Sequence, residues 1–204
     1  MRALIVVDVQ NDFLPGGALA VAGGDAVVPV ANRLMAASGC AVLTADWHPA
    51  GHLSFACNHP GAEPFSVIDM PYGKQVLWPA HCVAGTAGAG FAPGLEAWRA
   101  CAVVRKGMRA GCDSYSGFME ADRRTPTGLA GYLRERGVDA VDVCGLATDF
   151  CVAWTAMDAA AAGFAARIVT DASRAIDAGG SLAAARAAWL AAGVAEVSAA
   201  ELLG

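Results

Sequence analysis

Apolar residues recur along the chain in short, mostly continuous runs with few polar positions between them. The runs that we interpret as strands are Ala3–Val7, Ala41–Thr44, Ala102–Val104, Ala140–Val143, Arg167–Thr170 and a weaker one near Val194–Val197. Continuous apolarity, as opposed to strict alternation, is typical of strands that are buried on both faces. The pattern therefore predicts a sheet that is covered by helices on either side.

Helix-like segments separate these runs. They are Asp25–Ala37, Thr127–Arg136, Phe150–Ala162 and Ser181–Ala192. A glycine follows each within two residues, and glycine commonly ends helices because it adopts a left-handed backbone without steric cost. The alternation of strands and helices predicts a three-layer αβα fold with a mostly parallel central sheet of about six strands. We expect residues 1–204 to form a single domain.

One stretch, residues 47–94, interrupts this rhythm. It carries many glycines and six prolines, Pro49, Pro60, Pro64, Pro71, Pro79 and Pro93. Long excursions of this kind in compact domains are usually functional or disordered. Histidines and Trp78 occur in the same stretch, which favours function, and we interpret it as a metal-binding excursion. The glycines at 85, 88 and 90 match no phosphate-binding pattern, so we interpret them as a flexible turn.

Chemically active side chains follow four of the predicted strands. Asp8 follows the first, Asp46 and His48 the second, Lys106 the third, and the stretch Gly145–Cys151 the fourth. Ligands of open parallel sheets bind outside the carboxyl ends of the strands. These side chains are therefore expected at one edge of the sheet.

Cys151 lies where a buried strand gives way to a helix. In the first turn of a helix the unpaired amides and the dipole favour a thiolate and can hold an oxyanion. Asp8 would then be the general base, and Lys106 a cation that favours the thiolate. Each residue also has a plainer interpretation: Cys151 as a buried apolar side chain, Asp8 as a cap of the next loop, and Lys106 as a solvated charge.

The metal signal is the pair Asp46 and His48, followed by His52 and later by His81. Residues two apart on an extended backbone point to the same side, so Asp46 and His48 can share an ion, and the excursion returns His81 as a third ligand. Such a set leaves positions open for water and substrate, as catalytic sites do, and suits Zn, Fe or Mn. His52 is a further candidate ligand, with loop hydrogen bonding as its alternative, and for His59 we favour the loop role.

Composition narrows the class of protein. The chain has 204 residues, 56% hydrophobic composition and a net charge of −5, without a basic stripe that could bind nucleic acid. The first apolar run is too short for a signal peptide or a membrane span, so we expect a soluble, cytoplasmic protein. Seven scattered cysteines fit neither a disulfide framework nor a zinc ribbon. Arginine supplies nearly all positive charge, and Lys74 and Lys106 are the two lysines.

Five motifs together resemble the nicotinamidase/pyrazinamidase family of the isochorismatase-like cysteine hydrolase superfamily. They are V-V-D-V-Q-N-D-F, T-A-D-W-H-P-A-G-H-L-S-F, W-P-A-H-C-V, R-K-G with D-S-Y-S-G-F, and G-L-A-T-D-F-C-V, and they occur in the family's order over essentially the whole chain. The departures are small. Gly117 stands where many relatives have Ala, and Cys57 and Cys112 are extra thiols near the expected site whose roles the sequence does not define.

The resemblance implies a role for each matching residue. Asp8, Lys106 and Cys151 become the catalytic triad, and Asp46, His48 and His81 the ligands of one divalent ion. His52 matches a position that is a ligand in some members and supports the ligands in others. Phe13, Trp78 and Tyr115 match aromatic positions that line the substrate pocket. The amides of Ala147 and Cys151 would form the oxyanion hole, next to a cis peptide bond before Ala147.

The resemblance also implies an activity. Nicotinamide, and by analogy pyrazinamide, would be hydrolysed to the acid and ammonia through a thioester, as a step of NAD salvage. The expected partners are thus small molecules, without nucleic acid or membrane, and assembly into a homo-oligomer is compatible with the sequence. Two alternatives remain: a metal-free hydrolase of isochorismate or N-carbamoyl compounds, and a non-catalytic pyridine- or metal-binding module. The three metal-type ligands argue against the first, and the intact triad against the second.

Overall fold

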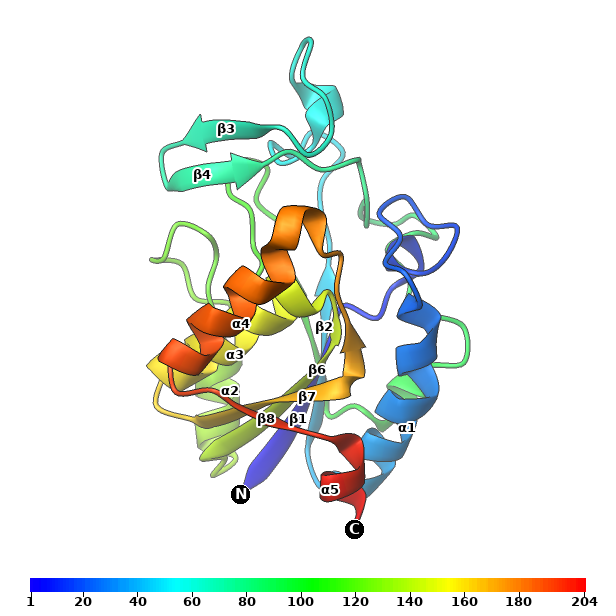
Figure 1. Ribbon diagram of the computed structural model, residues 1–204, viewed down its shortest axis with the longest axis vertical. Helices are drawn as coiled ribbons and strands as arrows, with labels where there is room; N and C mark the ends of the chain where they lie inside the picture. The colour runs from blue at the N-terminus through cyan, green and yellow to red at the C-terminus, as the bar shows by residue number, and fades with distance from the viewer.

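Six parallel strands form the central sheet, in the spatial order β5-β2-β1-β6-β7-β8 (Figure 1). The computed structural model describes residues 1–204. Its strands are β1 (Arg2–Val7), β2 (Ala41–Asp46), β3 (Val67–Met70), β4 (Gly73–Val76), β5 (Ala102–Lys106), β6 (Ala140–Leu146), β7 (Ala165–Arg174) and β8 (Ala195–Val197). The predicted six-stranded parallel sheet is confirmed.

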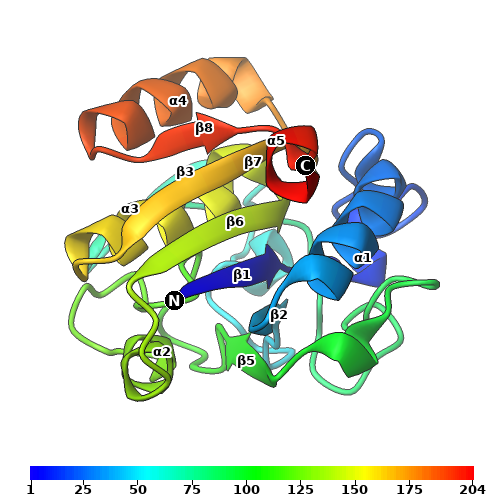
Figure 2. The same ribbon diagram turned by 90° about the horizontal axis from the view of Figure 1, so that it is seen from below.

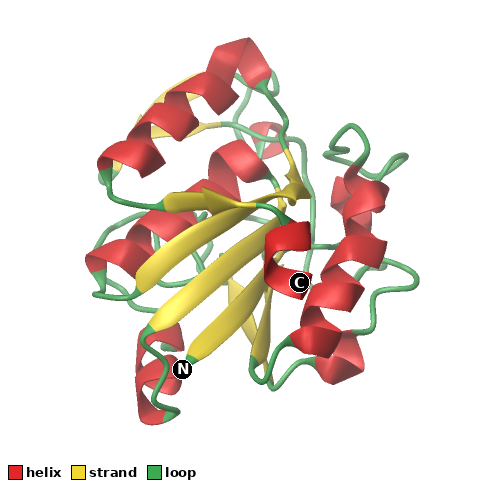
Figure 3. Cartoon of the chain, turned by 60° about the horizontal axis from the view of Figure 1, so that its bottom comes forward, coloured by secondary structure: helices red, strands yellow, loops and turns green.

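Helices cover both faces of this sheet (Figures 2 and 3). They are α1 (Val27–Ala37), α2 (Leu129–Glu135), α3 (Ala153–Ala161), α4 (Ser181–Ala191) and α5 (Ala199–Leu203). α1 and α5 pack on one face, and α2, α3 and α4 on the other. The three-layer αβα architecture is therefore confirmed.

The central strand β1 shows why its sequence is uniformly apolar. Leu4 and Val6 point into the core beneath α1, whereas Ile5 and Val7 point into the core beneath α2 and α3. All four are at most 4% exposed. Side chains of a strand alternate between the faces of a sheet, so a strand between two helical layers needs apolar residues at every position.

The excursion in residues 47–94 lies beyond the carboxyl ends of the strands. It contains the antiparallel hairpin of β3 and β4, which projects at the top of Figure 1 and is separate from the main sheet. A bridge between Phe55 and Trp78 and another between His48 and Val83 bring the excursion back to the sheet edge. None of the helices has both the length and the apolarity that a membrane crossing requires.

Candidate active site and metal centre

Cys151 lies in a π-helical turn, Thr148–Val152, that joins β6 to α3. The carbonyl of Ala147 accepts hydrogen bonds from the amides of Phe150 (3.2 Å) and Val152 (3.1 Å) and so begins the turn. The Leu146–Ala147 peptide bond is cis. We expected an ordinary helix to begin at about Phe150, but regular α-helix starts at Ala153, because the wider π turn comes first.

Asp8 stands directly after β1 in a left-handed backbone conformation, with φ of 48°. Non-glycine residues seldom adopt this conformation, because the Cβ is crowded against the backbone. Thr44 of β2 holds the residue in place. Its hydroxyl donates to Asp8 Oδ1 at 2.6 Å and accepts from the Asp8 amide at 3.2 Å. The neighbouring strand therefore orients the carboxylate.

Lys106 ends β5 and is completely buried. Its Nζ lies 2.9 Å from Asp8 Oδ2, 2.6 Å from Asp46 Oδ1 and 3.4 Å from Cys151 Sγ. It also donates to the carbonyl of Ser114 at 2.8 Å. One ammonium therefore contacts a carboxylate, a thiol and a predicted metal ligand, and this is why the solvated alternative for Lys106 is wrong.

Burial decides the direction in which the pKa values of Asp8 and Cys151 shift in this cluster. It raises the pKa of Asp8 to about 6, although Lys106 pulls in the opposite direction. Burial likewise raises the pKa of the Cys151 thiol well above its ordinary value, against the lowering by Lys106. We expected the helix terminus and the lysine to favour the thiolate, but in the resting cluster loss of solvation wins. The thiol therefore needs a base to become a nucleophile, and Asp8 lies within reach of it.

Asp46, His48 and His81 converge next to this cluster. Asp46 Oδ2 lies 3.7 Å from His48 Nε2 and 3.8 Å from His81 Nε2, and all three residues are buried. The other ring nitrogen of each histidine is held by a backbone carbonyl: His48 Nδ1 by Gly107 O at 2.9 Å and His81 Nδ1 by Pro79 O at 2.8 Å. Histidine ligands of metals are typically oriented in this way, so the donor set fits a divalent ion.

Glycine is required at position 107 for this arrangement. Its φ is +65°, and a Cβ there would collide with the ring of His48. The backbone can therefore approach the imidazole closely enough for its carbonyl to accept the Nδ1 proton. The motif R-K-G thus supplies both the buried ammonium and the close backbone approach that orients His48.

His52 lies next to the same group, and one of its ring nitrogens comes within 4.8 Å of a His48 nitrogen and an Asp113 carboxylate oxygen. Its Nδ1 lies 2.7 Å from Ser54 Oγ and its Nε2 lies 3.2 Å from the carbonyl of Cys112, while its ring packs 4.3 Å from that of His48. Both ring nitrogens of His52 therefore have partners within the protein. His59 binds the carbonyl of Leu53 at 2.7 Å, as a loop histidine would.

An aromatic pocket opens in front of Cys151. Phe13, Trp78 and Tyr115 line it together with Phe150 and Ile176. The Trp78 indole donates to the Tyr115 hydroxyl at 3.0 Å, and the rings of Trp78 and Phe150 meet edge to face at 4.9 Å. Flat walls of this kind suit an aromatic ring.

Several polar side chains, buried or half-buried, hold the site together and were not singled out from the sequence. Gln10 accepts from the Asp46 amide at 2.8 Å and donates to its carbonyl at 2.9 Å. Asp12 accepts from the Cys82 amide at 2.7 Å, next to His81. Both lie in the motif V-V-D-V-Q-N-D-F, whose polar residues after a buried strand were the available signal.

Gln75 and Asp149 secure the walls of the pocket from distant segments. Gln75 of β4, 1% exposed, donates to Asp113 Oδ2 at 2.6 Å and to the Tyr115 hydroxyl at 3.1 Å. The Asp149 carboxylate accepts from the amides of Ile176 (3.0 Å) and Asp177 (2.8 Å) and from the Ser181 hydroxyl (2.5 Å). Gln75 ties the hairpin to Tyr115, and Asp149 ties the loop carrying Ile176 to the turn carrying Cys151.

Residues 2–201 match the model of the isochorismatase domain. The chain belongs to the isochorismatase family. Its sequence is 55% identical to the nicotinamidase of Acinetobacter baylyi over 201 residues, which cover 98% of this chain and 94% of that protein. The family resemblance inferred from the five motifs is confirmed.

Solved structures of isochorismatase-family hydrolases superpose closely on this chain. The nicotinamidase/pyrazinamidase of Acinetobacter baumannii has a TM-score of 0.98 at 53% identity, covering 99% of this chain and 98% of that one. The pyrazinamidase of Pyrococcus horikoshii in complex with zinc has a TM-score of 0.78 at 35% identity, covering 97% and 98%. Both comparisons extend over the whole fold, including the edge that carries the site.

Proposed function

We propose that this chain hydrolyses nicotinamide to nicotinate and ammonia, and pyrazinamide to pyrazinoate, in NAD salvage. The observation that carries the proposal is the buried contact of Asp8, Lys106 and Cys151 beside a two-histidine, one-carboxylate donor set, at the base of an aromatic pocket. The activities named for its relatives support the choice of a pyridine or pyrazine carboxamide.

The proposed reaction begins with binding and proton transfer. The ring of the substrate lies between Phe13, Trp78 and Tyr115 and presents its carboxamide carbon to Cys151. Asp8 takes the thiol proton as the sulfur attacks, and its raised pKa suits a base that works near neutral pH. Lys106 stays charged and stabilises the developing thiolate and the ionised carboxylates.

When the sulfur attacks, negative charge develops on the carbonyl oxygen of the substrate and must be stabilised by hydrogen-bond donors. The amide of Ala147, which has no acceptor within the protein, and that of Cys151 are the proposed pair. One such donor is worth roughly 3–4 kcal/mol in other hydrolases. Asp8 returns its proton to the departing ammonia, which leaves a thioester on Cys151. The same carboxylate then activates water, and hydrolysis of the thioester releases the acid.

Asp46, His48 and His81 would hold the divalent ion, which is Zn, Fe or Mn in our proposal. When bound, the ion would supply a positive charge that attracts the ring nitrogen of the substrate and so orients the ring. The Pyrococcus horikoshii relative, whose structure is a complex with zinc, supports the proposal of a bound metal. His52 is proposed to support His48 and not to bind the ion directly.

An ammonia-release assay tests the proposal. The purified chain is given nicotinamide before chelation, after chelation, and after addition of Zn, Mn or Fe separately. We expect activity to fall on chelation and to return with at least one metal. Activity that survives the chelator and does not respond to metal would favour a metal-free hydrolase, and no ammonia under any condition would refute the proposal.

A further inference from the structure

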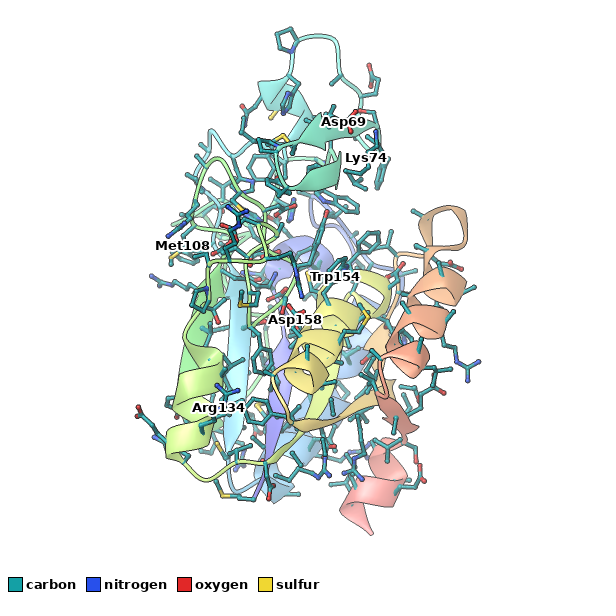
Figure 4. All side chains as sticks on the ribbon, turned by 90° about the vertical axis from the view of Figure 1, so that its left-hand side faces the viewer. Asp69, Lys74, Met108, Arg134, Trp154 and Asp158 are labelled. Atoms are coloured by element: carbon teal, nitrogen blue, oxygen red, sulfur yellow. The ribbon has the colours of Figure 1, made fainter.

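The hairpin of β3 and β4 is connected to the substrate pocket by more than one route. Figure 4 shows this hairpin, with Asp69 and Lys74 labelled, above the end of α3 that carries Trp154. One connection is the hydrogen bond from Gln75 of β4 to the Tyr115 hydroxyl, at 3.1 Å. A second connection runs through the turn that leads into β3.

This turn, residues 63–66, has an unusual residue at its third position. The amide of Ser66 donates to the carbonyl of Glu63 at 3.2 Å and closes the turn. Pro64 occupies the second position and Phe65 the third, where φ is +69°. A proline followed by a residue with positive φ is the pattern of a type II turn, whose third position usually belongs to glycine or asparagine. A phenylalanine therefore lies where the backbone favours glycine.

Burial does not explain the choice of Phe65. The residue is 51% exposed, so its ring recovers only part of the free energy that a bulky side chain loses in the left-handed region. Two other non-glycine residues with positive φ, Asp8 and Cys82, lie in the triad and next to His81. Backbone strain is concentrated at functional sites, so Phe65 calls for a functional explanation.

The ring of Phe65 packs against a wall of the substrate pocket. It meets the Trp78 indole edge to face, with ring centres 5.8 Å apart and an angle of 84°. Two backbone hydrogen bonds join the turn to the residue before Trp78: the Phe65 amide donates to the Leu77 carbonyl at 2.6 Å, and the Leu77 amide to the Ser66 carbonyl at 2.8 Å. Trp78 lines the pocket in front of Cys151, whereas Phe65 does not. Phe65 can therefore act on the pocket only through the indole.

The orientation of the Trp78 indole depends on its neighbouring side chains. The main chain of Trp78 is fixed by its bridge to Phe55. The indole donates to the Tyr115 hydroxyl at 3.0 Å and meets the Phe150 ring edge to face at 4.9 Å. Tyr115 and Phe150 both line the pocket themselves. Of the three aromatic side chains around the indole, Phe65 is thus the one that contacts it from outside the pocket.

We propose that Phe65 is a positioning residue of the substrate pocket, whose ring holds the Trp78 indole at the angle at which it forms a flat wall. That this wall receives a pyridine or pyrazine ring rests on the proposed function. The strained turn fixes the direction of the Phe65 ring, because its backbone is paired with Leu77. Without Phe65 the indole gains rotational freedom, which substrate binding must then remove.

The variant Phe65→Gly separates the ring from the turn. Glycine is preferred at this position of a type II turn, so the backbone keeps its shape while the ring is lost. We expect the KM for nicotinamide to rise about 3–10-fold, the equivalent of one edge-to-face aromatic pair, and kcat to change less than about twofold. Phe65→Tyr keeps the ring and should retain the KM of the parent.

Thermal unfolding of the same variants distinguishes positioning from structural support. Glycine relieves the left-handed strain, so the unfolding midpoint of Phe65→Gly should be no lower than that of the parent. The matched control is Val67→Ala, which shortens a 56% exposed apolar side chain of the same hairpin. This control should leave the KM unchanged, because Val67 has no ring against the indole.

The contact can also be tested without turnover, by near-ultraviolet circular dichroism of the tryptophans. We expect Phe65→Gly to change the spectrum of the parent and to have no further effect in a Trp78→Phe background, because the two residues act as one unit. A chain that does not hydrolyse nicotinamide would still give this result. Failure of the proposed function is therefore distinguishable from failure of the Phe65 contact.

Four results would overturn the proposal. They are an unchanged KM in Phe65→Gly, an equal rise of KM in Phe65→Tyr, an unfolding midpoint of Phe65→Gly below that of the parent, and a spectral change that persists in the Trp78→Phe background. The first two would show that the ring does not orient the pocket wall. The third would make Phe65 a support of the fold, and the fourth would place its effect on another tryptophan.

Discussion

The two halves of the site are built in different ways. The triad half comes from residues at the ends of parallel strands, Asp8, Lys106 and the turn after β6, whose spacing follows from strand pairing. The metal and pocket half depends on the excursion, which returns His81, Trp78 and Gln75 from outside the sheet. Strand pairing alone brings the reactive groups of the triad half together. The side chains that the excursion contributes depend instead on individual hydrogen bonds to hold them in position.

Removing the nucleophile should have the largest effect. Cys151→Ala is expected to lower ammonia release from nicotinamide by at least about 10⁴-fold, since the chemistry has no other nucleophile. The fold and the content of bound metal should stay unchanged, because Cys151 belongs to the triad half alone. Substantial residual turnover, or loss of metal, would contradict this division of the site.

The two lysines provide a matched pair for stability. Lys106→Met leaves the Asp8 and Asp46 carboxylates buried without their cation, and we expect loss of about 3–5 kcal/mol of unfolding free energy together with activity. Lys74→Met removes an exposed pair with Asp69 and should change stability by less than about 1 kcal/mol. Chemical denaturation measures both variants. Equal losses would show that the buried ammonium does not support the sheet edge.

The metal half can be disabled separately. His81→Ala removes one of three ligands and should weaken metal binding by more than about 100-fold, since even partners of ligands change affinity 10–100-fold. Metal content after dialysis, compared with that of Cys151→Ala, is the measurement. If the two variants retain equal metal, the assignment of His81 as a ligand is wrong.

The pH dependence tests the triad half alone. Asp8 must be ionised to act as a base, and burial raises its pKa to about 6. The kcat/KM for nicotinamide should therefore fall about tenfold per pH unit below that value and level off above it. If kcat/KM instead begins to fall only near pH 4, Asp8 is more solvated than its buried position indicates.

Asp149→Asn should have the smallest effect. An amide offers one acceptor oxygen where the carboxylate offers two, so one contact to Ile176, Asp177 or Ser181 is lost. We expect KM for nicotinamide to rise about 3–10-fold, the worth of one hydrogen bond, with a smaller change in kcat. The control is Asp25→Asn at an exposed position. A fall in kcat at constant KM would instead link Asp149 to the nucleophile.

Prediction from sequence succeeded where a local pattern determines position. The uniformly apolar β1 indicated burial on both faces, and parallel strands necessarily end at one edge, so the sequence alone groups Asp8, Asp46 and Lys106. The D-W-H spacing on extended backbone likewise indicated that Asp46 and His48 point to the same side, and Asp46 Oδ2 lies 3.7 Å from His48 Nε2.

Contacts between distant segments could not be predicted in the same way. The 2.6 Å contact of Lys106 with Asp46 depends on the pairing of β2 with β5, which one sequence does not reveal. Gln75 and Asp149 look like ordinary polar residues until their partners at positions 113, 115 and 176 are known. The state of the Cys151 thiol depends on a balance of desolvation and charge that no motif encodes.

The distribution of lysine has a practical consequence. Lys106 is fully enclosed, while the side chain of Lys74 is 73% exposed on the hairpin. Amine-directed reagents will therefore modify the folded protein at Lys74 and at the amino terminus, and leave the reactive centre untouched. A fluorophore or a surface tether attached at Lys74 would report on the hairpin without disturbing the chemistry beneath it.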